Sequence, residues 1–90
     1  MLTRNEAAAI CLAYEVGRIK VAFELTGTEY MLWRDSAKEP TGSLRIVEGC
    51  HAITWEVADV RIKNVAGRDH LVIVIVPADC CLDFMLEVGE

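Results

Sequence analysis

The sequence has few prolines and glycines, no long apolar segment and no signal-peptide pattern. Its 90 residues include 2 prolines and 6 glycines, spread out, which excludes a flexible linker or a collagen-like repeat. Its longest apolar run, residues 71–78, is far shorter than the roughly 20 residues of a membrane helix. Glu6 stands where a secretory signal would be basic, and no small-residue cleavage site follows. We therefore expect one domain, residues 1–90, in the cytoplasm and away from membranes.

Basic residues are absent from the last part of the chain. After Arg68 there is no lysine or arginine, and five acids follow: Asp69, Asp79, Asp83, Glu87 and Glu90. Residues 1–45 carry six acids and six bases, so the second half supplies the whole net charge of −5. Such a surface repels phosphate backbones and attracts a basic protein surface. We expect a protein partner with a basic surface and no direct binding to nucleic acid.

The 4 cysteines lack the spacing of a metal site or a disulfide framework. Neighbouring strand residues point to opposite faces, so Cys80 and Cys81 cannot converge on one ligand, and a disulfide between them would be strained. A site that joins Cys50 and His51 to one of that pair is the open alternative, without support from spacing. We expect no metal and no cofactor, and thiols that pack as small apolar groups.

No set of residues has the pattern of a catalytic site. The available bases are His51, whose neighbour Cys50 points away from it on a strand, and His70, which follows Asp69 at a turn. Phosphate-binding loops and nucleotide fingerprints are also missing. We therefore expect a protein that is not an enzyme. A minimal enzyme that uses a histidine with a cysteine remains a third hypothesis.

One helix is expected near the N-terminus, from Arg4 to Val16. Thr3 and Glu6 have the spacing of a capping box, in which each side chain satisfies a backbone N–H at the helix start. Apolar residues then recur on one stripe, and Gly17 can end the helix in the left-handed conformation. The stripe consists of Ala7, Ile10, Cys11 and Tyr14.

Alternation with a period of two marks most of the remaining chain as strands. The pattern slips by one residue near Ala58 and Asp59, which predicts a β-bulge or a tight turn between two strands. Residues 71–76 are apolar on both faces, so they should form a central strand. The predicted fold is α+β, with one N-terminal helix packed on a curved, mostly antiparallel sheet of five or six strands. Residues 35–43, with Pro40 and Gly42, form the one long loop.

A single helix covers only one side of such a sheet, which predicts either a sheet curled around the helix or a second copy of the chain on the open face. We favour a homodimer. The exposed apolar residues expected on that face are Met31, Trp33, Val47 and Met85.

Two groups of residues are candidates for partner binding. Tyr30, Trp33 and Arg34 precede the long loop, and tryptophan is enriched in binding hot spots. Asp79, Asp83 and Glu87 form an acidic strip along the last predicted strand, where they either dock onto a basic partner or only discourage aggregation at a sheet edge.

The leading hypothesis is a small non-enzymatic protein-interaction module. It would be an inhibitor-type, phage-like protein that occupies a basic surface of a partner that handles nucleic acid. The alternative is a small-ligand-binding domain with an apolar pocket between helix and sheet, lined by Phe23, Tyr30, Trp55 and Phe84.

Overall fold

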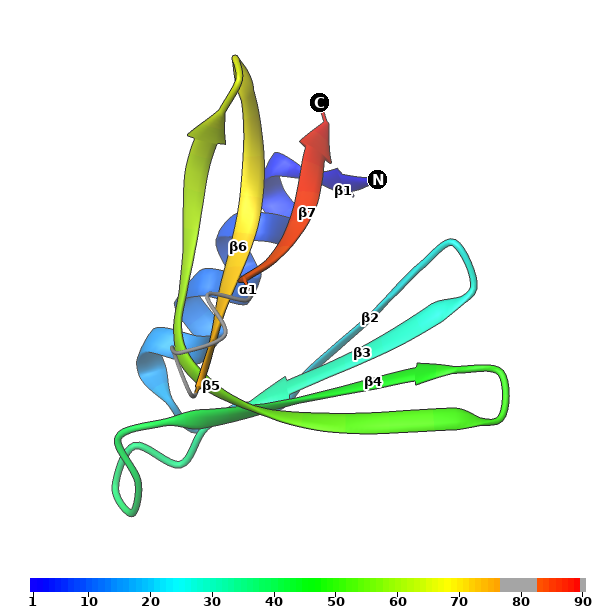
Figure 1. Ribbon diagram of the computed structural model, residues 1–90. Coiled ribbons are helices and arrows are strands. Elements are labelled where there is room, and N and C mark those ends of the chain that lie inside the picture. The colour runs from blue at the N-terminus through cyan, green and yellow to red at the C-terminus, as the bar shows by residue number, and fades with distance from the viewer. Residues whose placement is uncertain (77–82, 90) are drawn as a thin grey trace.

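The computed structural model describes residues 1–76 and 83–89 of the chain. These residues form one helix and seven strands, joined by turns and one longer loop (Figure 1). The elements are β1 (Leu2–Thr3), α1 (Arg4–Val16), β2 (Val21–Leu25), β3 (Thr28–Trp33), β4 (Gly42–Glu48), β5 (His51–Val65), β6 (Arg68–Val76) and β7 (Asp83–Gly89). The strands form one sheet in the order β1-β7-β6-β5-β4-β3-β2. Only β1 and β7 pair in parallel. The α+β class and the mostly antiparallel sheet are confirmed.

The predicted number of strands, five or six, is wrong. The additional strand is β1, where Leu2 pairs with Val88 and Thr3 with Gly89. Two residues are too few to show alternation, and their partner lies at the other end of the chain, so no local pattern reveals the pairing. β4 also begins at Gly42, inside the predicted loop.

The helix begins and ends where the capping residues predict. The Glu6 backbone N–H donates to Thr3 Oγ1 at 3.1 Å, and the Thr3 N–H donates to Glu6 Oε1 at 3.0 Å. Gly17 has φ of 70° and donates its N–H to the Ala13 carbonyl oxygen at 3.0 Å. A Cβ at Gly17 would lie 2.5 Å from the Ser36 Cβ, so both conformation and space require glycine there.

A β-bulge in β5 bends the sheet into two wings (Figure 1). The register of β5 against β6 shifts between Val57 and Asp59, at the place that the sequence predicts. We call β2, β3, β4 and β5 up to Val57 the first wing. β5 from Asp59 onward, with β6, β7 and β1, is the second wing. A bulge strengthens local twist and bends its strand, which lets one 15-residue strand serve both wings.

Two-residue turns fix the register of the hairpins. Thr26 and Gly27 both have positive φ (47° and 82°), as do Ala66 and Gly67 (53° and 83°), which is the pattern of type I′ turns. The β4–β5 turn has positive φ at Gly49 only, which fits a type II′ turn. These turns twist in the sense of the strands they join and therefore set which residues stand opposite one another.

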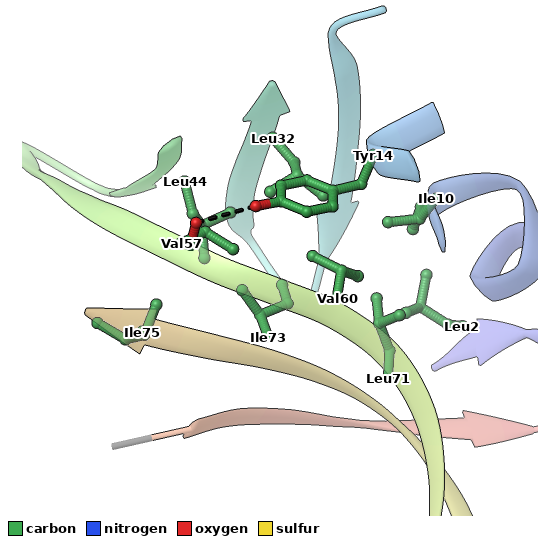
Figure 2. Close-up of a cluster of buried hydrophobic side chains, with 10 residues drawn as sticks. All are labelled: Leu2, Ile10, Tyr14, Leu32, Leu44, Val57, Val60, Leu71, Ile73 and Ile75. Atoms are coloured by element: carbon green, nitrogen blue, oxygen red, sulfur yellow. Dashed lines mark hydrogen bonds between the residues drawn. The ribbon is translucent and has the colours of Figure 1, made fainter. Parts of the chain in front are cut away.

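The core lies inside the angle between the wings, where α1 packs (Figure 2). The Tyr14 hydroxyl donates a hydrogen bond of 2.9 Å to the Val57 carbonyl oxygen, beside the bulge. Tyr14 and Val57 belong to a cluster of ten buried residues: Leu2, Ile10, Tyr14, Leu32, Leu44, Val57, Val60, Leu71, Ile73 and Ile75. We call the side of the sheet that faces α1 the inner face.

β6 lies between β5 and β7, so the predicted central position of residues 71–76 is confirmed. Leu71, Ile73 and Ile75 are buried on the inner face. On the outer face Val72 is only 2% exposed, although no second layer of the described chain covers it. Its register partners there are Arg61 and Met85, whose long side chains flank it.

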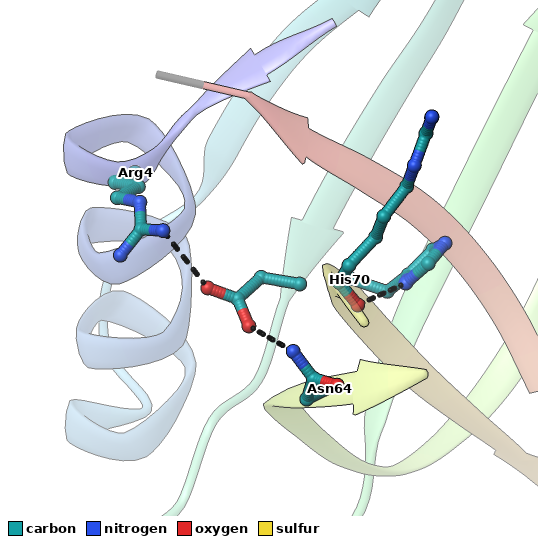
Figure 3. A network of polar contacts seen from close by, with 5 residues as sticks. Arg4, Asn64 and His70 are labelled. Atoms are coloured by element: carbon teal, nitrogen blue, oxygen red, sulfur yellow. Dashed lines mark hydrogen bonds and ion pairs between the residues drawn. The ribbon is translucent and has the colours of Figure 1, made fainter. Parts of the chain in front are cut away.

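Polar contacts attach the start of α1 to the β5–β6 hairpin (Figure 3). Arg4 Nη2 lies 3.4 Å from Asp69 Oδ2, and Asn64 Nδ2 donates to Asp69 Oδ1 at 3.2 Å. Arg4 is 72% exposed and Asp69 28% exposed, so water screens the ion pair and it contributes little to stability. These contacts hold the helix against the second wing. None of the helices in the described residues is long and apolar enough to span a membrane.

Candidate binding groove on the inner face

Three cross-strand rows cover the inner face of the first wing. The row nearest α1 contains Leu32 and Leu44, which are at most 1% exposed. The middle row runs Phe23, Tyr30, Ile46, Ile53 from β2 to β5. α1 does not bury this row: Ile53 is 54% exposed. The first wing therefore carries an apolar surface that extends beyond its helix.

A hollow of about 470 Å³ lies between this surface and β7. Its lining residues are Ile46, Glu48, His51, Ile53, Trp55 and Phe84. The rings of Trp55 and Phe84 meet edge to face, with centroids 5.8 Å apart and planes at 65°, so β7 closes one side. The volume lies within the range of about 300–1,000 Å³ that is typical of small-molecule sites. We call this hollow, with the adjoining Phe23 and Tyr30, the inner groove.

Polar side chains lie at the β4–β5 end of the inner groove. Glu48 pairs with His51 across the Gly49–Cys50 turn, on the same face as the apolar rows. Tyr30 stacks on Phe23, with centroids 5.0 Å apart and planes at 10°. Burial, together with the charge of Glu48, raises the pKa of Tyr30, so its hydroxyl keeps its proton. This end of the groove offers both donors and acceptors of hydrogen bonds.

The structure separates the three candidates near the long loop. Tyr30 lies on the inner face, whereas Trp33 lies on the outer face, where it pairs with Ser43. Arg34 Nη2 donates to the Glu15 carbonyl oxygen at 2.7 Å, and its guanidinium carbon lies 4.6 Å from the centre of the Tyr14 ring. Arg34 thus holds the end of α1. The three residues do not form one surface.

The acidic candidates lie on an outer face that also carries bases. Arg68 Nη1 contacts Glu87 Oε1 at 2.6 Å, and Asp83 is exposed. The cross-strand rows on this face place acids among bases: Asp59, Arg61, Lys63, Arg68, Asp83 and Glu87. Three of these six residues are acidic and three are basic, so the described part of this face carries charges of both signs. Asp79 lies outside the described residues.

The apolar residues expected on one dimer face are divided between the wings. Met31, Trp33 and Val47 share the outer face of the first wing, where Met31 is 38% exposed. Met85, 54% exposed, lies on the outer face of the second wing. No outer apolar patch formed by all four residues exists.

The histidines and cysteines do not converge in the described residues. His51 lies on the inner face of the first wing, whereas His70 lies on the outer face of the second. His70 Nδ1 lies 3.0 Å from the Arg68 carbonyl oxygen (Figure 3). The described part of the chain holds no group of three or more His, Cys, Asp or Glu that could bind a metal. Cys80 and Cys81, the pair central to the alternative metal site, lie outside it.

The sequence indicated four of the eight groove residues as lining a pocket and missed the other four as members of that site: Ile46, Glu48, His51 and Ile53. The signal that could have placed them is the two-residue separation at Gly49–Cys50. It predicts a hairpin, and the hairpin sets Glu48 opposite His51 and Ile46 opposite Ile53.

No family model, no curated protein and no solved structure matches this chain. The function proposed below therefore depends on the residues and geometry of the inner groove.

Proposed function

We propose that this protein is a non-enzymatic binding domain whose inner groove takes a small amphipathic ligand, with an apolar body and a hydrogen-bonding end. The observation that carries the proposal is the hollow between Ile53 and Phe84, apolar along its length and polar at the β4–β5 turn. Ligand sites of small molecules have this composition: mostly apolar, with a few polar groups that fix orientation.

The apolar part of the groove supplies the affinity. Each Å² of apolar surface removed from water contributes about 25 cal/mol. Ile53, Trp55 and Phe84 all expose apolar atoms, and a hydrocarbon chain laid along them would bury surface on both partners. The site is formed without the ligand, because the hairpin turns and the bulge fix the strands that carry it. Little ordering is then required on binding.

The polar end determines which ligands fit. Glu48 accepts hydrogen bonds, and its negative charge disfavours a carboxylate nearby. The protonated Tyr30 hydroxyl adds a donor, and the His51 side chain is part of the lining. An amine or a hydroxyl at the end of an apolar chain matches this set better than an acid.

A thermal-shift series tests the proposal with decylamine, decanol and decanoate as probes. At ten times its dissociation constant a ligand stabilises by about 1.4 kcal/mol, which raises the Tm of a domain this size by roughly 6–11 °C. We expect the amine and the alcohol to raise Tm and the acid to do so less. If none of the three raises Tm, the groove is not a site for such ligands.

Two variants locate the binding. Ile53→Lys places a positive charge in the groove, where it repels an ammonium probe, and Met85→Lys places one on the opposite face at a residue with the same exposed fraction, 54%. The shift should disappear in Ile53→Lys and persist in Met85→Lys. Loss of the shift in Met85→Lys alone would place the ligand elsewhere.

Docking onto a basic partner is the second candidate function. The observation that favours it is the row Asp59, Val74, Asp83, in which two acids flank an apolar residue on the outer face. Reversing Asp83 and Glu87 to lysine should abolish capture of a partner from host lysate. Unchanged capture would exclude this face as the interface.

A further inference from the structure

β2 forms an open edge of the sheet. It stands last in the strand order and has β3 as its single neighbour within the described residues. In a two-residue hairpin the pair that flanks the turn is hydrogen-bonded, so Leu25, Phe23 and Val21 direct their backbone groups toward β3. Ala22 and Glu24 direct theirs outward. An open edge of this kind is a template for another strand.

The sequence around β2 is complementary to itself when two copies run antiparallel. With Ala22 opposite Ala22 of a second copy, Lys20 stands opposite Glu24, Val21 opposite Phe23, and Ile19 opposite Leu25. Ile19, 55% exposed in the single chain, then gains an apolar neighbour. Each pair joins residues of matching character, and directly opposite pairs are the contacts that stabilise a sheet.

The charges of the single chain favour this arrangement. Glu24 stands directly opposite Glu29 on the outer face, and like charges in that position are destabilising. Among the described residues neither carboxylate forms an ion pair. Lys20 of a second copy would lie on the other side of Glu24 and compensate the repulsion.

Neighbouring registers lose these pairs. Moving the centre to Phe23 sets Glu24 against Ala22 and Lys20 against Thr26. Moving it to Val21 sets Lys20 against Ala22 and Leu25 against Gly17. The register centred on Ala22 is the one that pairs both Lys20 with Glu24 and Ile19 with Leu25.

We infer that the protein forms a two-fold homodimer through β2, with Ala22 on the symmetry axis. The axis is perpendicular to the sheet, because opposite residues of an antiparallel pair lie on the same face. The inner faces of both copies are therefore continuous, and Phe23 of each copy lies next to Val21 of the other. The two inner grooves then adjoin across the axis. This inference stands without the proposed ligand.

Cysteine cross-linking tests the register, in a Cys50→Ser background that removes an exposed thiol. Ala22→Cys places two cysteines directly opposite, within the α-carbon range of about 4.4–6.8 Å that a disulfide needs. In Glu24→Cys the two cysteines are offset by four residues, about 13 Å, which is too far. Oxidation should cross-link the Ala22→Cys variant and leave Glu24→Cys and the background uncross-linked. Equal cross-linking of both variants would overturn the register.

A charge swap tests the interface by light-scattering molar mass. The unaltered chain should have the mass of a dimer. Lys20→Glu should raise the dissociation constant about tenfold or more, and Lys20→Glu combined with Glu24→Lys should restore it. A monomer for the unaltered chain at 100 µM, or larger open assemblies, would overturn the inference. So would a dimer that the single charge reversal leaves unchanged.

Discussion

The two wings carry similar apolar side chains on their inner faces but differ in what covers them. Ile73 in the second wing is fully buried beneath α1, whereas Ile53 in the first is 54% exposed. The helix accounts for the difference: it begins beside β1 and the β5–β6 hairpin and ends at Gly17, and Tyr14 in its last turn bonds to Val57 at the bulge. The core therefore follows the helix across both wings, and the middle row of the first wing, which the helix does not reach, stays partly exposed.

The position of the bulge creates this division. Without the bulge β5 would twist only gradually along its length. The bend at Val57 and Asp59 instead sets the two wings at an angle, so that Phe84 of β7 reaches Trp55 of β5. The apolar surface that the helix leaves open becomes a groove with two walls.

The largest expected effect comes from making the same substitution in both wings. Ile73→Ala should reduce the free energy of unfolding by about 2–5 kcal/mol, because it leaves a cavity in a fully buried site. Ile53→Ala removes a half-exposed side chain and should cost less than about 1 kcal/mol. Urea denaturation of both variants measures the difference. Equal losses would mean that Ile53 belongs to the core.

Removing one hydroxyl from the core and, separately, one from the groove gives a smaller effect. Tyr14→Phe leaves the Val57 carbonyl oxygen at the bulge without its donor and should cost about 1–3 kcal/mol. Tyr30→Phe serves as the control. Its hydroxyl has no hydrogen-bond partner among the described residues, so unfolding should change little while binding of an amine probe weakens. A loss of stability in Tyr30→Phe as large as that in Tyr14→Phe would show that the groove is a structural element.

The cap of α1 makes a contribution that depends on pH. Thr3→Ala should cost about 1 kcal/mol. The hydrogen bonds from Thr3 hold the pKa of Glu6 below its ordinary value, so its contribution is present above the unfolded pKa and is lost as pH falls through the folded pKa. The stability difference between the unaltered chain and Glu6→Gln should therefore shrink on acidification below about pH 4.5. A difference that stays constant from pH 7 to pH 3 would exclude the capping carboxylate as its source.

The smallest effect is a difference in thiol reactivity. Burial, with the charges of Asp59 and Glu15, raises the pKa of Cys11, whereas Cys50 is exposed in the β4–β5 turn. Since the thiolate is the reactive form, iodoacetamide at pH 8 should modify Cys50 before Cys11. Peptide mapping by mass spectrometry gives the order. Faster modification of Cys11 would mean that α1 detaches readily from the sheet and exposes this thiol.

The elements with strong local patterns could be predicted from the sequence, and those set by distant pairing could not. The capping box and Gly17 define α1, and the slip in alternation locates the bulge. β1 was not predicted because its two residues pair with the far end of the chain. The grouping of Tyr30 with Trp33 relied on nearness in sequence, although residues three apart on a strand face opposite ways.

The candidate site could be predicted only in part, for a similar reason. Phe23, Tyr30, Trp55 and Phe84 share the inner face, but in the described part of the chain the hollow lies between strands and has no lining residue from α1, unlike the expected pocket between helix and sheet. Phe84 reaches Trp55 because β5 bends. The excess of acids after Arg68 suggested a one-signed surface. Pairing of β7 with β6 places Arg68 beside Glu87, a contact between residues 19 positions apart that a count of charges along the chain does not show.

Fluorescence of Trp55 tests the central claim, that the inner groove is a binding site, most directly. Trp33 lies on the outer face, so Trp33→Phe leaves Trp55 as the one tryptophan of the chain and as a reporter inside the groove. Titration of that variant with decylamine should shift or quench the Trp55 emission along a saturable curve that Ile53→Lys abolishes. An emission that stays constant while the probe still raises Tm would show that the ligand binds outside the groove and would contradict the account.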